Sequence, residues 1–141
     1  MVLPQMKRRR RGIIVNVTSA AGIFPVPLVS MYGATKQFLN RFSQALQAEL
    51  HGTGVECQLV HPMFVATSLI QQWESLGIYR ILPAPVERYC RMAVWTIGKT
   101  RETTGYWAHG VQLMLLKMKP LAVLMATTAY LFRILRDMKI N

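Results

Sequence analysis

A tyrosine and a lysine stand four residues apart in the sequence, at Tyr32 and Lys36. On a helix this spacing places both side chains on one face, one turn apart. An ammonium group near a phenol favours the phenolate, so the phenol can exchange a proton with an alcohol or a developing alkoxide. Ser19 precedes Tyr32 by thirteen residues, and its hydroxyl can bond the same substrate oxygen. The three residues predict proton transfer at a carbonyl or alcohol, although the Tyr32–Lys36 pair alone also fits a surface contact.

The elements that must position these side chains form a predicted βαβ unit. The run GIIVNV at residues 12–17 is typical of a strand buried on both faces of a parallel sheet. Apolar side chains at helical spacing predict a helix over Met31–Leu50, and VECQLV predicts a second strand over Val55–Val60. Ligands of such sheets bind at the carboxyl ends of the strands, where Ser19 and Pro62 fall.

The second half of the chain is predicted to be mostly helical. Pro85 is suited to the first turn of a helix, and TTGYWAH at residues 103–109 predicts a short strand or an extended loop. The predicted helices are Ser68–Leu76, Pro85–Ile97, Gly110–Lys119 and Pro120–Lys139. We divide the chain into a catalytic part at residues 1–110 and an apolar, basic helical region at residues 111–141.

Composition and charge exclude several classes of protein. The 141 residues are 52% hydrophobic, which excludes a disordered chain. The 17 Lys and Arg against 6 Asp and Glu give a net charge of +11, which favours an anionic partner. Cys57 and Cys90 are too few for a disulfide framework. The three His have no metal-binding spacing, so we predict no metal site, and no G-x-S-x-G motif indicates a serine hydrolase.

Two basic segments leave alternatives open. The run Lys7–Arg11 reads as a nucleic-acid patch or as a solvated helix end. Because no aromatic residues interleave with it, we favour the solvated end and predict no nucleic-acid partner. The uncharged stretch Pro120–Phe132 is shorter than the ~20 residues that span a bilayer. With its basic flanks it predicts either a helix on a membrane surface or a buried helix with solvated ends.

Taken together, the motifs GIIVNVTSAAG, P-x-P, YGATK and GTGVECQLVHPMFVAT resemble the C-terminal half of a short-chain dehydrogenase/reductase. The family's Y-x-A-[ST]-K pattern matches Tyr32 to Lys36, and its interval from catalytic Ser to Tyr is kept. The segments FPVPLVSMYGATK, FVAT and TTGYWAH look most like the membrane-associated 17-beta-hydroxysteroid dehydrogenases and very-long-chain 3-oxoacyl-CoA reductases. The resemblance implies an α/β fold, the C-terminal half of a Rossmann-like doubly wound parallel sheet followed by apolar helices.

The resemblance also implies roles for individual residues. Tyr32 would be the general acid/base, Ser19 would orient the carbonyl, and Lys36 would hold the nicotinamide ribose. The stretch Pro62–Thr67 would line the nicotinamide, with Val65 and Thr67 closest to it. The implied cofactor is NADP(H), with NAD(H) not excluded, and the implied reaction interconverts a ketone and a secondary alcohol.

The substrate, partners and location are predicted on the same basis. An apolar substrate, a steroid or a 3-oxoacyl-CoA, would fit a pocket of apolar side chains, which fit ordinary core packing equally well. Residues proposed for this pocket are Phe24, Val26, Leu28, Trp73, Leu76 and Tyr79. The group's location predicts the endoplasmic reticulum membrane, or its cytoplasmic face. The helix Met31–Leu50 is a candidate surface for a homo-oligomer.

The sequence departs from the family at two places. Pro62 is followed by Met63, where the family usually has glycine with its greater backbone freedom. No glycine-rich dinucleotide fingerprint precedes Ser19, and the family's Asn-Asn-Ala-Gly segment and catalytic Asn are missing. We therefore expect a fragment or short isoform of a reductase, or a short product that needs a partner. The alternative function is a non-catalytic membrane-associated or interaction protein that retains the motif.

Overall fold

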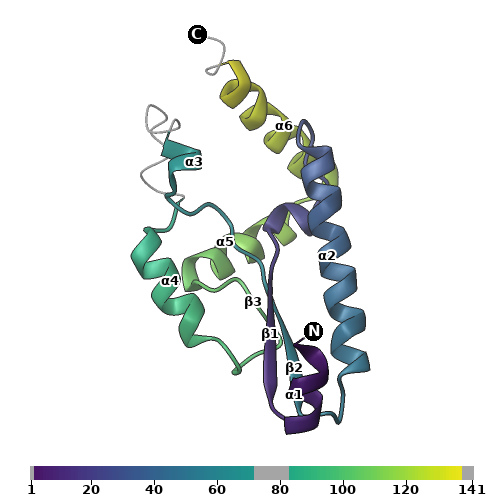
Figure 1. Ribbon diagram of the computed structural model, residues 1–141. Helices are drawn as coiled ribbons and strands as arrows, with labels where there is room; N and C mark the ends of the chain where they lie inside the picture. Colours follow the sequence, from purple (N-terminus) through teal and green to yellow (C-terminus); the bar gives the residue numbers. More distant parts are fainter. Residues whose placement is uncertain (1, 72–82, 138–141) are drawn as a thin grey trace.

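A parallel three-stranded sheet forms the centre of the molecule in the computed structural model, which describes residues 2–71 and 83–137 (Figure 1). The strands are β1 (Gly12–Val17), β2 (Val55–Val60) and β3 (Glu102–Thr103), in the order β1-β2-β3. The register pairs Gly12 with Val55 and Val17 with Val60, so β1 and β2 end at the same level. The two long strands and the α/β class are confirmed as predicted.

Two helices cover one face of the sheet. Helix α2 (Ser30–Glu49) runs beside β2, and α1 (Leu3–Arg9) lies at the amino end of β1. The apolar core on this face is formed by the end of α2 and the buried side of β2, with Met6 and Ile14 packed against it. Its buried members are Leu50, Val55 and Cys57. The basic run occupies the last turn of α1 and the residues after it, as expected for a solvated helix end.

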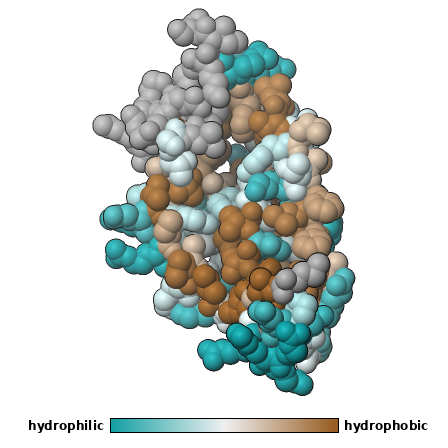
Figure 2. Space-filling view, viewed as in Figure 1, coloured by the Kyte–Doolittle hydropathy of each residue, from teal (hydrophilic) through white to brown (hydrophobic). Residues whose placement is uncertain are grey.

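The opposite face of β1 is open, which corrects the prediction of a strand buried on both faces. Burial alternates along β1, and Ile13, Val15 and Val17 are exposed by 37%, 37% and 53%. Figure 2 shows a hydrophobic patch in the middle of the molecule in this view. The reason is that α1 and the core pack on the side of β1 that carries Ile14, while the side chains of the other face have no comparable cover; β1 is also an edge strand among the described residues. In β2 only Glu56 is exposed.

Within residues 2–71 and 83–137, the remaining elements are four helices and a 3-10 turn. Of the predicted helix Ser68–Leu76 the structure describes α3 (Ser68–Gln71), and the predicted helix Pro85–Ile97 is α4 (Val86–Trp95). The segment predicted as a strand or loop, Thr103–His109, is divided: β3 ends at Thr103, and α5 (Trp107–Lys117) begins before His109. Helix α6 is Leu121–Asp137, and η1, a single 3-10 turn, is Ala20–Gly22.

The C-terminal helices bear on the predicted division of the chain at residue 110 and on the prediction that the C-terminal stretch does not span a bilayer. Helix α5 runs across residue 110, where we divided the chain, and the division itself stays a prediction. Among the described residues no helix is both long enough and apolar enough to cross a bilayer.

Candidate active site

Ser19 lies where the two long strands end. The Thr18 amide donates to the Val60 carbonyl at 2.8 Å, and the Ala20 amide donates to the Pro62 carbonyl at 3.0 Å. These two bonds hold the residues after β1 against the residues after β2. Ser19 caps η1, because its Oγ accepts the Ala21 amide at 3.2 Å. Among the described residues this hydroxyl donates no hydrogen bond, so its proton is available as a donor.

Helix α2 approaches this corner closely, and two glycines allow it. A Cβ on Gly22 of η1 would lie 2.8 Å from the Lys36 carbonyl carbon, and one on Gly33 would lie 3.1 Å from the Ala21 oxygen. Larger residues would push the helix away from the turn that follows Ser19. Asn40, one turn beyond Lys36, also donates to the Gly22 carbonyl at 2.9 Å. The SAAG and YGATK motifs are thus packed together.

Tyr32 and Lys36 lie on the same face of α2, as predicted. The Lys36 Nζ is 5.6 Å from the centre of the Tyr32 ring and donates to the Val17 carbonyl at 3.4 Å. Val17 is the last residue of β1, two positions before Ser19. Tyr32 is half exposed, and its hydroxyl has no hydrogen-bond partner among the described residues. The structure therefore brings Ser19, Tyr32 and Lys36 to one corner, with a phenol free to meet a ligand.

The predicted cofactor segment Pro62–Thr67 begins beside Ser19 and continues away from Tyr32 and Lys36 towards the residues before α4. Pro62 is joined to Ala20 by the bond above, whereas no hydrogen bond among the described residues joins Val65 or Thr67 to Tyr32 or Lys36. Instead Val65 forms a parallel bridge with Ala84, before α4. The Phe64 carbonyl accepts the Ala84 amide at 2.9 Å. The roles of Pro62, Val65 and Thr67 stay predictions.

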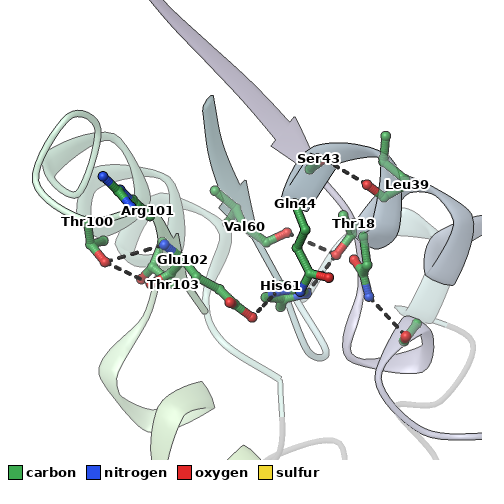
Figure 3. Close-up of polar contacts among 12 residues, drawn as sticks. Thr18, Leu39, Ser43, Gln44, Val60, His61, Thr100, Arg101, Glu102 and Thr103 are labelled. Atoms are coloured by element: carbon green, nitrogen blue, oxygen red, sulfur yellow. Dashed lines mark hydrogen bonds and ion pairs between the residues drawn. The ribbon is translucent and has the colours of Figure 1, made fainter. Parts of the chain in front are cut away.

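A buried histidine that the sequence did not single out joins the ends of all three strands. His61 follows β2 and is 3% exposed. Its Nε2 is 2.8 Å from the Glu102 carboxylate of β3, and its Nδ1 is 2.8 Å from the Thr18 hydroxyl beside Ser19. Figure 3 shows Glu102 and Thr18 on opposite sides of the ring. The signal available in the sequence was a titratable residue directly between a strand and Pro62.

Burial decides the charge of this histidine. Desolvation lowers the pKa of His61 below its ordinary value of 6.5, and the nearby Lys117 lowers it further. The charge and hydrogen bond of Glu102 oppose this shift but are smaller than the effect of burial. At neutral pH the pair is therefore a hydrogen bond from a neutral imidazole to a carboxylate, and Thr18 donates to the other ring nitrogen.

The predicted substrate pocket is only partly within the described residues. Phe24 and Val26 are half-buried, and Leu28 is exposed in a left-handed backbone conformation at φ 69°. A leucine at positive φ is uncommon and marks a constrained loop directly before α2. The other predicted pocket residues, Trp73, Leu76 and Tyr79, lie outside the described residues.

Comparison with known proteins identifies the family. The sequence profile of the short chain dehydrogenases matches residues 1–76, which include Ser19, Tyr32, Lys36 and the segment after β2. The chain belongs to this family. It is 41% identical over 112 residues to very-long-chain 3-oxoacyl-CoA reductase-A of Danio rerio, covering 79% of this chain and 34% of that protein. It is 36% identical over 123 residues to the inactive hydroxysteroid dehydrogenase-like protein 1 of Homo sapiens, covering 85% and 36%.

Solved structures support the fold. A 7beta-hydroxysteroid dehydrogenase structure superposes with a TM-score of 0.75 over 90% of this chain and 51% of that one, at 19% identity. The short-chain dehydrogenase/reductase resemblance and the Rossmann-like fold class are confirmed. The chain spans about a third of the length of the curated relatives reported above.

The residues present fit one end of a dinucleotide. A half-exposed phenol and a lysine ammonium beside the carboxyl ends of β1 and β2 provide donors for a ribose and a nicotinamide. The sequence before Ser19 holds no glycine-rich turn for the pyrophosphate. The residues at this corner thus offer groups for a ribose and a nicotinamide but not for a pyrophosphate.

Proposed function

We propose that the protein formed with this chain is an NADP(H)-dependent oxidoreductase that interconverts a ketone and a secondary alcohol on an apolar substrate, a steroid or a 3-oxoacyl-CoA. The observation that carries the proposal is the Tyr32–Lys36 pair held against the end of β1, beside Ser19. Solved members of the family hold NADP in one case and NAD in another, so NAD(H) is the alternative cofactor.

In this proposal the side chains of the chain control a proton. A bound nicotinamide supplies or accepts the hydride. During reduction, the Tyr32 hydroxyl donates its proton to the carbonyl oxygen as the alkoxide develops. The Ser19 hydroxyl bonds the same oxygen and fixes its position. The Lys36 ammonium, 5.6 Å from the Tyr32 ring, stabilises the phenolate that remains, and it is held there by the Val17 carbonyl.

The test is Tyr32→Phe in the protein that carries a cofactor-binding half upstream of this chain. Removal of a general acid lowers kcat by about 10²- to 10⁴-fold. Tyr130→Phe makes the same chemical change on the surface of α6, where Tyr130 is 69% exposed, and should leave kcat unchanged. Equal carbonyl-reduction rates for Tyr32→Phe and the parent would remove Tyr32 from the mechanism.

A second proposal is that the chain is a non-catalytic interaction protein that retains the motif. It is supported by the similarity to a relative described as inactive. The test is a titration of this chain with NADPH, followed by nicotinamide fluorescence. This proposal expects no binding below about millimolar NADPH, and a micromolar Kd would contradict it.

We also propose that the protein works at the endoplasmic reticulum membrane, with the cytoplasmic face as the alternative. Helices α5 and α6 support this, because they expose large apolar side chains and also carry basic ones. Trp107, Met114, Met118 and Leu121 are all more than half exposed. An amphipathic surface with cationic flanks is suited to the headgroup region of a bilayer.

A further inference from the structure

His109 is completely buried in the first turn of α5, yet both of its ring nitrogens contact the segment after β2. Its Nδ1 is 3.4 Å from the Met63 amide nitrogen, and its Nε2 is 3.0 Å from the Phe64 carbonyl. A backbone amide can only donate, so Nδ1 is the acceptor. The proton must then lie on Nε2, which donates to Phe64. One neutral imidazole thus binds two consecutive backbone groups.

Aromatic rings fix the imidazole in this orientation. The Tyr89 ring of α4 is 5.5 Å from it, and the Tyr106 ring is 5.3 Å away in an edge-on arrangement. Burial raises the pKa of Tyr89 to about 12, so that ring is uncharged. The same Phe64 carbonyl also accepts the Ala84 amide, and the Ala84 carbonyl accepts the Ala66 amide. The residues after Pro62 are therefore tied to α5 and to the chain before α4.

We infer that His109 is a positioning residue that holds the backbone of Met63 and Phe64 in place for the cofactor. The inference rests on the proposed function, in which this segment lines the nicotinamide. A segment ordered before binding avoids the conformational entropy that ordering would otherwise cost at that step. Ser19, Tyr32 and Lys36 are held by other contacts, so loss of the His109 bonds should weaken cofactor binding more than the chemical step.

The experiment compares two substitutions of His109. His109→Phe keeps a ring between the two tyrosines and removes both hydrogen bonds, whereas His109→Gln retains an acceptor and a donor in one neutral group. Hydrogen exchange of the peptide containing residues 62–67, measured by mass spectrometry, is the first readout. We expect at least about tenfold faster exchange at Met63 for His109→Phe and recovery toward the parent for His109→Gln.

The matched control is Gln58→Leu. Gln58 is also buried, and its amide binds two backbone groups, the Thr96 carbonyl at 2.9 Å and the Gly98 amide at 3.3 Å. Gln58→Leu removes a similar pair of hydrogen bonds, but these bonds join β2 to residues 96–98 and not to the segment 62–67. Hydrogen exchange at residues 62–67 should therefore stay at the parental rate. Parental exchange in His109→Phe, or equal acceleration in Gln58→Leu, would overturn the inference.

Two further measurements separate the outcomes. In the protein with its cofactor-binding half, His109→Phe should raise the KM for the cofactor about tenfold and change kcat by less than about twofold. A fall in kcat with unchanged KM would contradict positioning. If Tyr32→Phe is fully active, the proposed function fails while the exchange result stands.

The ¹⁵N chemical shifts of the His109 imidazole in the parent protein test the two hydrogen bonds even if His109→Phe does not fold. A protonated Nδ1 could not accept the Met63 amide and would overturn the inference.

Discussion

The two buried histidines, His61 and His109, are the residues whose charge the fold most constrains. Burial is the largest cause that lowers the pKa of each below 6.5. The opposing contributions come mainly from Glu102 for His61 and from backbone hydrogen bonds for His109. Both rings have both nitrogens engaged, so each is held as a neutral donor–acceptor. A neutral imidazole can join two backbone or side-chain groups that a lysine or a carboxylate could not join alone.

A first prediction follows for the dependence of stability on pH. Above about pH 6.5, the usual His pKa, folded and unfolded chains both leave these rings neutral, so their contribution to stability is fully present. Below that value the unfolded chain takes up two protons that the folded chain does not. The free energy of unfolding should then fall, by at most about 2.7 kcal/mol per pH unit, until the lowered folded-state pKa values are passed.

Urea unfolding between about pH 7.5 and pH 5 measures this slope. The double variant His61→Gln and His109→Gln keeps neutral hydrogen-bonding groups and should flatten the curve in that range. If the double variant kept the parental slope, other groups would carry the pH dependence.

At the scale of elements, the extent of α2 was predicted correctly. Its apolar side chains, however, divide into some that pack in the core and some that are exposed to solvent. Leu46 and Leu50 pack with the core of the sheet. Phe38 and Phe42, earlier in the helix, stack on each other with ring centres 6.4 Å apart and are 72% and 49% exposed. Helical spacing shows that these side chains are apolar and periodic, but it does not tell which surface covers them.

The same limit explains which parts of the site the sequence could predict. Ser19 follows β1, and Tyr32 and Lys36 lie on the next helix, so the spacing of a continuous segment together with the family motif was enough to predict that they lie together. The contacts of His61 and His109 join residues 41 to 46 positions apart in the chain. No local pattern encodes such pairs. The aromatic run before His109 favoured an extended conformation, and burial of His109 in the first turn of α5 overrides that preference.

A second prediction concerns the exposed half of α2. The helix Met31–Leu50 is the candidate surface for a homo-oligomer; if a second copy covers its exposed Phe38 and Phe42, Phe38→Glu with Phe42→Glu should weaken self-association at least about a hundredfold. Sedimentation equilibrium measures the change. Val94→Glu is the control, because Val94 is 64% exposed on α4. An unchanged association constant would show that another surface joins the copies.

At the scale of the whole molecule, two groups of basic residues lie in different parts of the chain, at α1 and at α5–α6. The run Lys7–Arg11 forms the last turn of α1 and the residues after it, at the bottom of Figure 1, and hydrophilic side chains gather there in Figure 2. Helix α6 lies at the opposite end of the molecule in Figure 1. Lys117, Lys119, Arg133 and Arg136 belong to α5, α6 and the turn between them. The two clusters therefore make separable contributions to any anionic surface.

The last prediction uses this separation to test the membrane proposal. Flotation with vesicles that contain anionic lipid should carry the protein upward at low salt and less at about 0.5 M salt, because screening weakens the attraction. Replacing the four C-terminal cations by Gln should remove up to about 4 kcal/mol of binding, near 1 kcal/mol for each charge. The matched variant replaces Lys7, Arg8, Arg9 and Arg11 and keeps Arg10, which donates to the Gly52 carbonyl. The apolar side chains of α5 and α6 lie only beside the C-terminal cations, so we expect the N-terminal variant to float like the parent. Loss of flotation in the N-terminal variant alone would place the anionic contact at α1 instead.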